Sequence, residues 1–243
     1  MTAPATLFIR RRAEAGATSA ESLLRAVVWA GTAVFAAIHA ALIVSRYNRF
    51  GIYTFDFGIF DQGLWLLSRF DNPFVTLRGL NLFADHSSYV MVLLTPLYWI
   101  WADPRLLLVV TVIAIAAAGP LLYAIGRRIG LQPVLAAAIA LAFLVHPAVR
   151  WAVWDNFHPE IVVLPLLLGA VVLVLDERPW WAVGLVAIAL TAKEDVALVV
   201  VPFGLWVAWR YRQRTAGLAM AGLGVAAFAL NFLVLLPLFS PTG

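Results

Sequence analysis

Long apolar runs alternate with short polar stretches along the whole chain. A helix needs about 20 consecutive apolar residues to cross the hydrocarbon core of a bilayer. This rule predicts membrane-spanning helices at residues 26–45, 106–126, 131–149 and 215–239. The run at 161–175 is shorter and needs flanking residues to cross. The remaining run, at 180–209, is interrupted at residues 193–195. This interruption predicts a helical hairpin with these charged residues at its tip.

Arginine clusters predict the direction of each span, because cytoplasmic loops carry an excess of Lys and Arg. If residues 10–12 are cytoplasmic and residues 87–102 do not cross, the later clusters all fall on the cytoplasmic side, namely Arg127/Arg128, Arg178 and Arg210/Arg212/Arg214. The predicted fold class is therefore an all-α polytopic membrane bundle of about seven transmembrane helices. It has a cytoplasmic N-terminal segment at 1–25 and a single transmembrane module at 26–243. An outer loop at about 46–104 follows the first span and carries amphipathic surface helices.

Composition narrows the class of protein further. Hydrophobic residues make up 63% of the 243 residues and charged residues 12%, with a mean hydropathy of +0.92. Soluble domains are about 45–50% apolar and ~25% charged. The lack of cysteine excludes disulfides, thiol catalysis and thiolate metal sites. We expect a multi-pass protein of the plasma (inner) membrane, with membrane lipids and no nucleic acid among its partners.

Most of the chemically capable side chains fall on the predicted outer face, beginning with the stretch YTFDFGIFDQGLW. Phe57, Phe60, Leu64 and Leu67 recur at helical spacing, which predicts an amphipathic helix on the membrane surface. Asp56 lies where this helix begins, so it is either an N-cap or a catalytic carboxylate, and a cap can also be catalytic. Asp61 lies within the same helix and either faces water or binds substrate.

Two histidine motifs follow in the predicted outer loops. In ADHSSY, His86 and the aspartate before it are suited to orienting a substrate, relaying a proton or binding a metal. The alternative is a helix start capped by Ser87 or Ser88. In WDNFHPE, the proline and Glu160 suit a first helical turn, whereas His158 has no such structural explanation. By contrast, His39 and His146 lie on apolar spans and are expected in the core or at a helix interface.

The motif TAKEDVA marks the tip of the predicted hairpin. Its arms are each about 20 Å long as helices, against a core of ~30 Å. The tip therefore lies below the outer surface, in a polar cavity that opens outward, because an unpaired charge at that depth is costly. Lys193 either pairs with Glu194 or Asp195, or holds a phosphate as a compact point charge.

The expected ligands follow from these side chains. Substrate-binding candidates are Asp61, His86, His158, Glu160, Lys193, Glu194 and Asp195. Carboxylate and imidazole groups also bind Mn²⁺ or Mg²⁺, so the candidate ligands of a divalent cation are Asp56, His86, His158 and Glu160. The chain has no Walker loop, nucleophile elbow, HExxH or GxGxxG motif. Nucleotide chemistry in the cytoplasm is therefore not expected, and a phosphorylated donor would arrive through the membrane.

Four motifs, FDFGIFDQGLW, ADHSSY, FHPE and TAKEDVAL, occur in this order between the apolar runs. Together they resemble a bacterial family of membrane proteins defined by a domain of unknown function, over roughly residues 53–214. That family is distantly similar to the polytopic C-type glycosyltransferases, which include the protein mannosyltransferases and the aminoarabinose transferase of lipid A. Those enzymes transfer a sugar from a polyprenyl-phosphate donor at the outer face.

This resemblance implies a role for two residues. Asp56 matches the loop aspartate that acts as general base or metal-assisted catalyst, although Phe57 replaces the acidic neighbour that many such enzymes have. Lys193 matches a position near the donor phosphate. Members of both groups usually continue beyond residue 243, so a membrane protein partner is expected to supply a missing C-terminal part if this chain is a truncated or split member.

The sequence therefore favours a glycosyltransferase-like membrane protein that uses a polyprenyl-phosphate sugar, with Asp56 as catalytic residue. Two alternatives stay open. A transporter or lipid-handling protein would use intramembrane Lys, Glu and Asp for proton coupling, but the chain shows no internal repeat. A non-catalytic subunit of an envelope-assembly complex would explain the short length.

Overall fold

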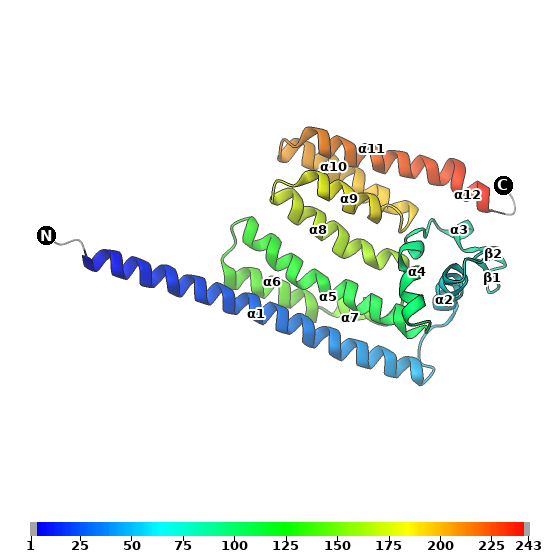
Figure 1. Ribbon diagram of the computed structural model, residues 1–243, viewed down its shortest axis with the longest axis horizontal. Helices are drawn as coiled ribbons and strands as arrows, with labels where there is room; N and C mark the ends of the chain where they lie inside the picture. The colour runs from blue at the N-terminus through cyan, green and yellow to red at the C-terminus, as the bar shows by residue number, and fades with distance from the viewer. Residues whose placement is uncertain (1–3, 241–243) are drawn as a thin grey trace.

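The computed structural model describes residues 4–240, with side chains from residue 19 onward. Helices form most of this part, so the all-α expectation is confirmed apart from one two-stranded hairpin. The bundle helices lie side by side and the first helix extends past them (Figure 1). In chain order the elements are α1 (Pro4–Asn48), α2 (Phe55–Ser68), β1 (Phe74–Val75), β2 (Leu80–Asn81), α3 (Leu82–Asp85), α4 (Val90–Ile100), α5 (Arg105–Arg128), α6 (Pro133–Val145), α7 (Pro147–Trp154), η1 (Pro159–Val162), α8 (Val163–Leu175), α9 (Pro179–Ala189), η2 (Glu194–Val196), α10 (Ala197–Arg210), α11 (Arg214–Leu230), η3 (Asn231–Leu235) and α12 (Leu236–Phe239).

Three described helices are long and apolar enough to cross a membrane: Ser19–Asn48, Arg105–Arg128 and Arg214–Phe239, the last running from α11 to α12. A fourth candidate is the pair α6–α7, which is bent by 43°. The apolar helices α4, α9 and α8 with its η1 turn are shorter. A multi-pass membrane protein is thus supported, but length and composition identify only three or four of the seven predicted spans among residues 4–240. The predicted cytoplasmic segment 1–25 lies mostly outside the residues whose side chains are described.

The bend between α6 and α7 has a local cause. His146 precedes a proline, and a residue in that position is driven out of the helical region; its ψ is accordingly 134°. The His146 ring is exposed, and its Nδ1 accepts a hydrogen bond from the backbone N–H of Ala148 at 3.2 Å, which caps α7. The expectation of a core or interface His146 is therefore wrong. His39 is half-buried and bonded to the Phe35 carbonyl oxygen at 2.9 Å, as expected.

The apolar run at 180–209 forms two helices, α9 and α10, that meet at the predicted interruption. Glu194 and Asp195 begin the short η2 turn between them. Beyond the turn, α10 packs on α11 at very close range, since a methyl group added at Gly204 would lie 2.6 Å from the carbonyl oxygen of Gly217. Small residues permit such backbone approach between membrane helices. The two arms of the predicted hairpin are therefore present as helices.

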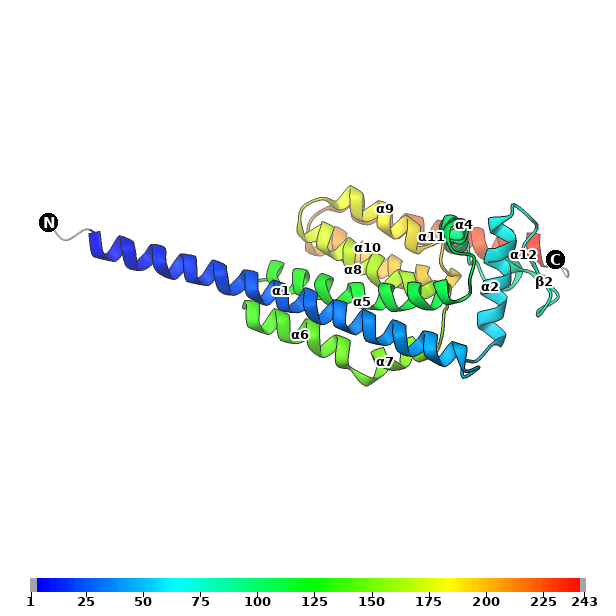
Figure 2. The same cartoon turned by 60° about the horizontal axis from the view of Figure 1, so that its bottom comes forward.

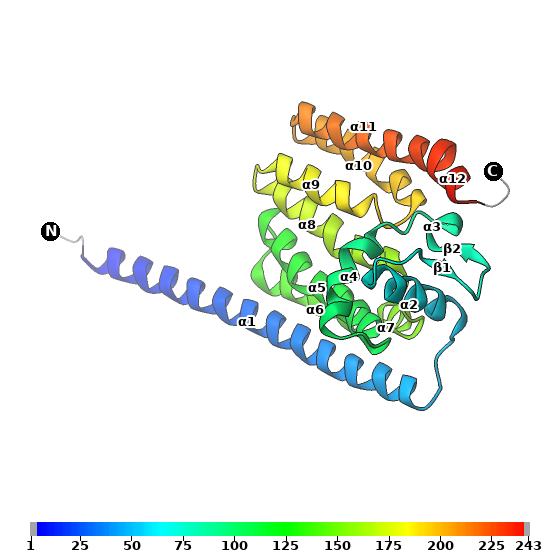
Figure 3. The same ribbon diagram turned by 45° about the vertical axis from the view of Figure 1, so that its right-hand side comes forward.

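Polar contacts distinguish the two ends of the bundle. At one end, which we call the arginine end, the termini of α5, α8 and α11 are joined to one another and to α1 by Arg128–Asp176 at 2.6 Å, Arg127–Glu21 at 2.9 Å and Gln213–Val174 at 3.2 Å. At the opposite end, which we call the loop end, α2, α3, α4 and the β-hairpin cover the bundle (Figure 3). The α9–α10 turn also lies at the loop end, beside α4.

The helix α4 runs across the ends of the bundle helices rather than alongside them (Figures 1 and 2). The backbone N–H of Val90, its first residue, donates to the Thr191 carbonyl oxygen at 2.9 Å. This bond joins α4 to the α9–α10 turn. The orientation agrees with the expectation that residues 87–102 do not cross.

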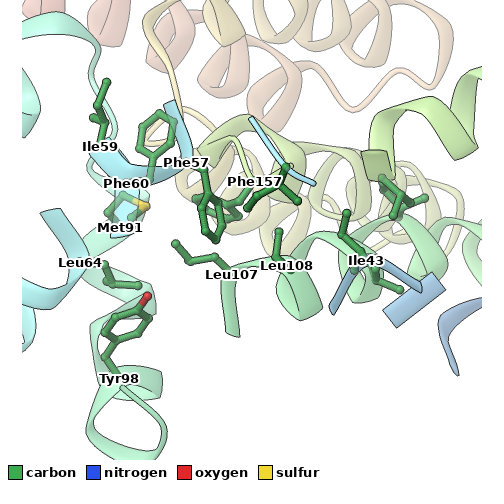
Figure 4. Close-up of a cluster of buried hydrophobic side chains, with 14 of the residues drawn as sticks. Ile43, Phe57, Ile59, Phe60, Leu64, Met91, Tyr98, Leu107, Leu108 and Phe157 are labelled. Carbon is green, nitrogen blue, oxygen red and sulfur yellow. The ribbon is translucent and has the colours of Figure 1, made fainter. Parts of the chain in front are cut away.

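The amphipathic helix expected after the first span is α2, and its apolar face contacts protein. Phe57, Phe60 and Leu64 are buried in one core cluster with Leu107 and Leu108 of α5 (Figure 4). Leu67, the fourth position of the apolar stripe, is half-buried against the same cluster. This packing fixes α2 at the loop end. The β-hairpin that follows it was not predicted.

Candidate functional site

A polar cavity of about 300 Å³ opens at the loop end. Four separate segments build it, from α2, the α3–α4 connection, the start of η1 and the α9–α10 turn. Five residues that the sequence singled out therefore share one space: Asp56, His86, His158, Glu160 and Lys193. The full lining is Asp56, Ile59, Phe60, Leu82, Asp85, His86, Ser88, His158, Glu160 and Lys193.

Asp56 lies in the first turn of α2, after the N-cap residue Thr54. The interpretation of Asp56 as the N-cap is therefore wrong. Its side chain is 63% exposed, and one carboxylate oxygen, Oδ2, lies 4.0 Å from Nε2 of His158. The open carboxylate thus faces the cavity beside an imidazole.

Asn156 holds the two segments that carry Asp56 and His158 together. Its Nδ2 donates to the carbonyl oxygen of Tyr53 at 3.2 Å, and its backbone has φ +70°. Asn adopts this left-handed conformation more readily than most residues. The next residue, Phe157, is fully buried against Phe60 at 5.9 Å between ring centroids. Sequence reasoning missed Asn156, for which the only local signal was an asparagine beside Asp155.

Glu194 positions His86 and does not line the cavity. Its Oε1 lies 2.8 Å from Nδ1 of His86, and its Oε2 accepts the backbone N–H of Ser87 at 3.1 Å. Burial raises the pKa of the Glu194 carboxyl, but the hydrogen bonds from backbone N–H groups and from His86 outweigh burial and lower the pKa below its ordinary value. Since a carboxylate only accepts, His86 donates from Nδ1 and presents Nε2 to the cavity.

The cation at the cavity is Lys193, and its first partner is Glu160. Nζ of Lys193 lies 3.2 Å from Oε1 of Glu160 and 4.0 Å from Oδ2 of Asp195. Burial lowers the pKa of the Lys193 ammonium, but the nearby carboxylates, Glu160 first, outweigh it and raise the pKa. The ammonium therefore stays charged. The expected pairing with Asp195 is present at the longer distance, whereas Glu194 bonds to His86 instead.

Besides Glu194, two more of the candidate residues lie outside the polar cavity. Oδ1 of Asp61 accepts a hydrogen bond from the Tyr98 hydroxyl at 2.5 Å. Burial raises the pKa of Asp61, against the opposing effect of that bond. Asp195 is 58% exposed on the turn and is not part of the lining. The helix start expected at Ser87 or Ser88 is not capped by either, because α4 begins after Tyr89, whose side chain makes no cap.

The arrangement does not by itself form a metal site. Among the described residues, no three His, Asp or Glu side chains are grouped so as to hold a metal ion. Two of the four candidate ligands are engaged with other protein groups, His86 with Glu194 and Glu160 with Lys193. Binding of Mn²⁺ or Mg²⁺ stays a prediction from the sequence.

Comparison with known proteins gives the family. Residues 46–243 match the family model described as "Predicted membrane protein (DUF2079)". The chain belongs to this family. The matched range contains α2, the β-hairpin, α3, α4 and every residue that lines the polar cavity of this DUF2079 protein. No curated protein and no solved structure matches the chain.

Proposed function

We propose that the protein is an integral membrane glycosyltransferase. It transfers a sugar from a polyprenyl-phosphate donor to an acceptor hydroxyl at the outer face of the plasma (inner) membrane. The observation that supports this function is the presence of an open carboxylate, Asp56, and a charged ammonium, Lys193, in one cavity of about 300 Å³. A base for the acceptor and a cation for the departing phosphate are the two groups that this reaction needs.

The proposed topology has seven crossings with the loop end outside. The bent pair α6–α7 and the helices α8, α9 and α10 join the three long helices, and successive helices alternate in direction between the two ends (Figures 1 and 2). Placing the arginine end in the cytoplasm satisfies the positive-inside rule and puts the N-terminus there. α9 has 11 residues, or about 16 Å of helix against a core of ~30 Å. The polar cavity beside its end therefore lies within reach of a lipid-borne donor entering from the outer leaflet.

In the proposed reaction the acceptor hydroxyl gives its proton to Asp56. The acceptor oxygen attacks the anomeric carbon and forms the new glycosidic bond, with inversion. The bond from that carbon to the phosphate oxygen breaks, and its electron pair leaves with polyprenyl phosphate. Lys193 stabilises the charge that grows on the phosphate, as a compact cation does.

The remaining cavity residues position the substrates in this proposal. His158, 4.0 Å from Asp56, orients the carboxylate. His86 is held by Glu194 and presents Nε2 to a sugar hydroxyl. When the donor phosphate binds Lys193, it replaces Glu160 as the partner of the ammonium. The Glu160 carboxylate then accepts hydrogen bonds from the sugar.

The test is transfer by the full chain in nanodiscs. Radiolabelled undecaprenyl-phosphate mannose and glucose serve as donors and a cell-envelope extract as the source of acceptor, and the release of undecaprenyl phosphate is measured. Asp56→Asn should lower the rate by about 10²–10⁴-fold, the usual contribution of a general base. The substitution keeps the size of the side chain, and the membrane level and unfolding temperature should not change.

Asp61→Asn is the matched control. It makes the same chemical change on the same helix, but Asp61 contacts Tyr98 outside the polar cavity. We expect this variant to retain the wild-type rate. Wild-type protein that releases no undecaprenyl phosphate from either donor, or equal losses in the two variants, would contradict the proposed function.

A further inference from the structure

A second cavity, which we call the aromatic cavity, opens on the flank of the loop end. Its volume is about 310 Å³, within the range of small-ligand sites. It lies where the end of α1, the segment before α2 and the end of α7 meet. Its lining consists of Arg46, Tyr53, Trp151, Trp154 and Asp155. None of these residues takes part in the proposed transfer.

Arg46 organises the walls of the aromatic cavity. Its guanidinium carbon lies 5.1 Å from the centre of the Trp154 ring and 5.9 Å from that of Tyr53. Its Nη1 donates to the Trp154 carbonyl oxygen at 2.9 Å. Cation–π contacts of this kind hold a guanidinium against aromatic faces. The guanidinium of Arg46 thus occupies the position over the aromatic rings that a cationic ligand would need. The cavity is therefore unsuited to a cationic ligand.

Two aromatic rings and a carboxylate remain available to a ligand. Trp151 is 68% exposed and Tyr53 is 73% exposed. Asp155 is exposed, and its backbone N–H donates to the Trp151 carbonyl oxygen at 2.9 Å, which fixes it beside that tryptophan. A flat apolar face next to a hydrogen-bond acceptor matches a sugar ring, which has an apolar face and hydroxyl groups around its edge.

Two chain segments lead from the wall of the aromatic cavity to that of the polar cavity. Asp56 is three positions after Tyr53 in the chain, and His158 is three positions after Asp155. A chain of three residues spans at most about 11 Å. The Asn156–Tyr53 hydrogen bond ties these segments together. The backbone at Tyr53 therefore lies within about 11 Å of the backbone at Asp56, a separation that one or two sugar units can bridge.

We infer that the aromatic cavity is a saccharide-binding subsite. Trp151 and Tyr53 stack on a sugar ring, and the Asp155 carboxylate accepts hydrogen bonds from the hydroxyl groups of the sugar. The subsite would hold the acceptor, which makes the acceptor of the transfer a saccharide; this assignment rests on the proposed function. Interfacial aromatic belts are common in membrane proteins. Such a belt explains exposed rings but not a carboxylate and a ring-stacked guanidinium among them.

Saccharide binding by the full chain tests this inference. Fluorescently labelled protein in a detergent without a sugar headgroup is applied to an array of immobilised saccharides, and the dissociation constant of the strongest binder is then measured in solution. Trp151→Ala should weaken binding by about tenfold or more, the effect of losing one aromatic contact. Trp151→Phe, which keeps a stacking face, should recover part of the affinity.

Trp180→Ala is the matched control, because Trp180 is an equally open tryptophan, 62% exposed, at the start of α9 beside the arginine end. It should leave saccharide binding unchanged. If the wild type binds no saccharide more strongly than Trp151→Ala does, or if the two variants lose binding equally, the rings form an interfacial belt and the inference fails.

The outcome is separable from that of the transfer assay. Binding that depends on Trp151 in a protein that transfers no sugar would overturn the proposed function and keep the subsite. Transfer with an unchanged KM for acceptor in Trp151→Ala would overturn the subsite alone.

Discussion

Two carboxylates at the loop end show how the surroundings of a residue decide its role. Glu194 accepts hydrogen bonds through both of its oxygens, and these bonds lower its pKa although burial opposes them. Asp61 receives one bond from Tyr98, and burial dominates, so its pKa is raised. Glu194 is therefore an ionised positioning group. Asp61 is a carboxyl group whose charged form is disfavoured by folding.

The raised pKa of Asp61 predicts how its replacement changes stability with pH. Folding favours the protonated carboxyl, so its contribution is fully present below about pH 3.8, its ordinary pKa, and is lost as the pH rises through the folded-state pKa. The amide of Asp61→Asn does not ionise, and its oxygen can still accept a hydrogen bond from the Tyr98 hydroxyl. We expect the variant to unfold at a higher temperature than the wild type at pH 7, because it avoids the cost of the ionised carboxylate.

This difference should shrink as the pH falls and vanish below 3.8, where the wild-type carboxyl is protonated in both the folded and the unfolded state. Thermal unfolding of both proteins in the same detergent, followed by tryptophan fluorescence across this pH range, measures it. A variant less stable than the wild type at pH 7 would mean that the ionised carboxylate is the favoured form.

At the scale of elements, the segments before α2 and η1 depend on one another. Asn156 joins them through its left-handed backbone and its bond to the Tyr53 carbonyl oxygen. Asn156→Ala removes the bond and places alanine in a left-handed conformation that asparagine tolerates better and that costs most residues roughly 1–2 kcal/mol. Together with the lost hydrogen bond, roughly 0.5–1.5 kcal/mol, the variant should be about 2 kcal/mol less stable.

Asn156→Gly separates the two causes. Glycine accepts the positive φ without strain but also lacks the amide, so it should cost about 1 kcal/mol through the lost bond. Denaturant unfolding in mixed micelles measures both variants. Equal stabilities of the alanine and glycine variants would show that backbone strain at this position is not significant.

The sequence predicts most elements of this protein but not all of their boundaries. Apolar runs locate the helices, because every helix that packs in the bundle must be apolar over most of its length. The interruption at residues 193–195 and the surface helix α2 were also predicted from charge and periodicity. The bend at His146 was missed, since the apolar pattern continues through it and only Pro147 signals the break. The β-hairpin was missed because strands of two residues leave no periodic pattern.

At the scale of the whole molecule, seven crossings make a definite prediction for labelling. The chain has no cysteine, so single cysteines can be introduced at exposed positions and treated with a membrane-impermeant maleimide in intact cells. Cysteines at Thr76 and Asp195 should react. Cysteines at Gln132 and Arg178 should react only after the membrane is permeabilised.

Each alternative topology gives a different labelling pattern. If α4 crossed, a cysteine at Gln132 would become accessible from outside. If only α1, α5, α6–α7 and α11–α12 crossed, Arg178 would lie outside with Asp195, and a cysteine there would react in intact cells. Either pattern would contradict the seven-span arrangement and separate the arginine end from the cytoplasm.

The grouping of side chains around the polar cavity was predicted only in part. The positive-inside rule placed the polar motifs on one face, and the structure brings five of the candidate residues to one space. Pairings within that space were not predictable, because His86 and Glu194 are 108 residues apart and several carboxylates competed for each partner. The same limit applies to the aromatic cavity, whose residues come from three separate segments.

The bond between His86 and Glu194 also determines when the polar cavity is completed during translation. A ribosome makes His86 108 residues before Glu194, and Lys193 is made immediately before Glu194. Until the α9–α10 turn has been made, the nascent segment that carries Asp56 and His86 lacks the carboxylate that anchors His86 and the ammonium that shares the cavity with Asp56. For most of its synthesis, the nascent chain therefore has the early part of the cavity, around Asp56 and His86, without the part that Lys193 supplies. A ribosome that stalls before Lys193 leaves the cavity incomplete.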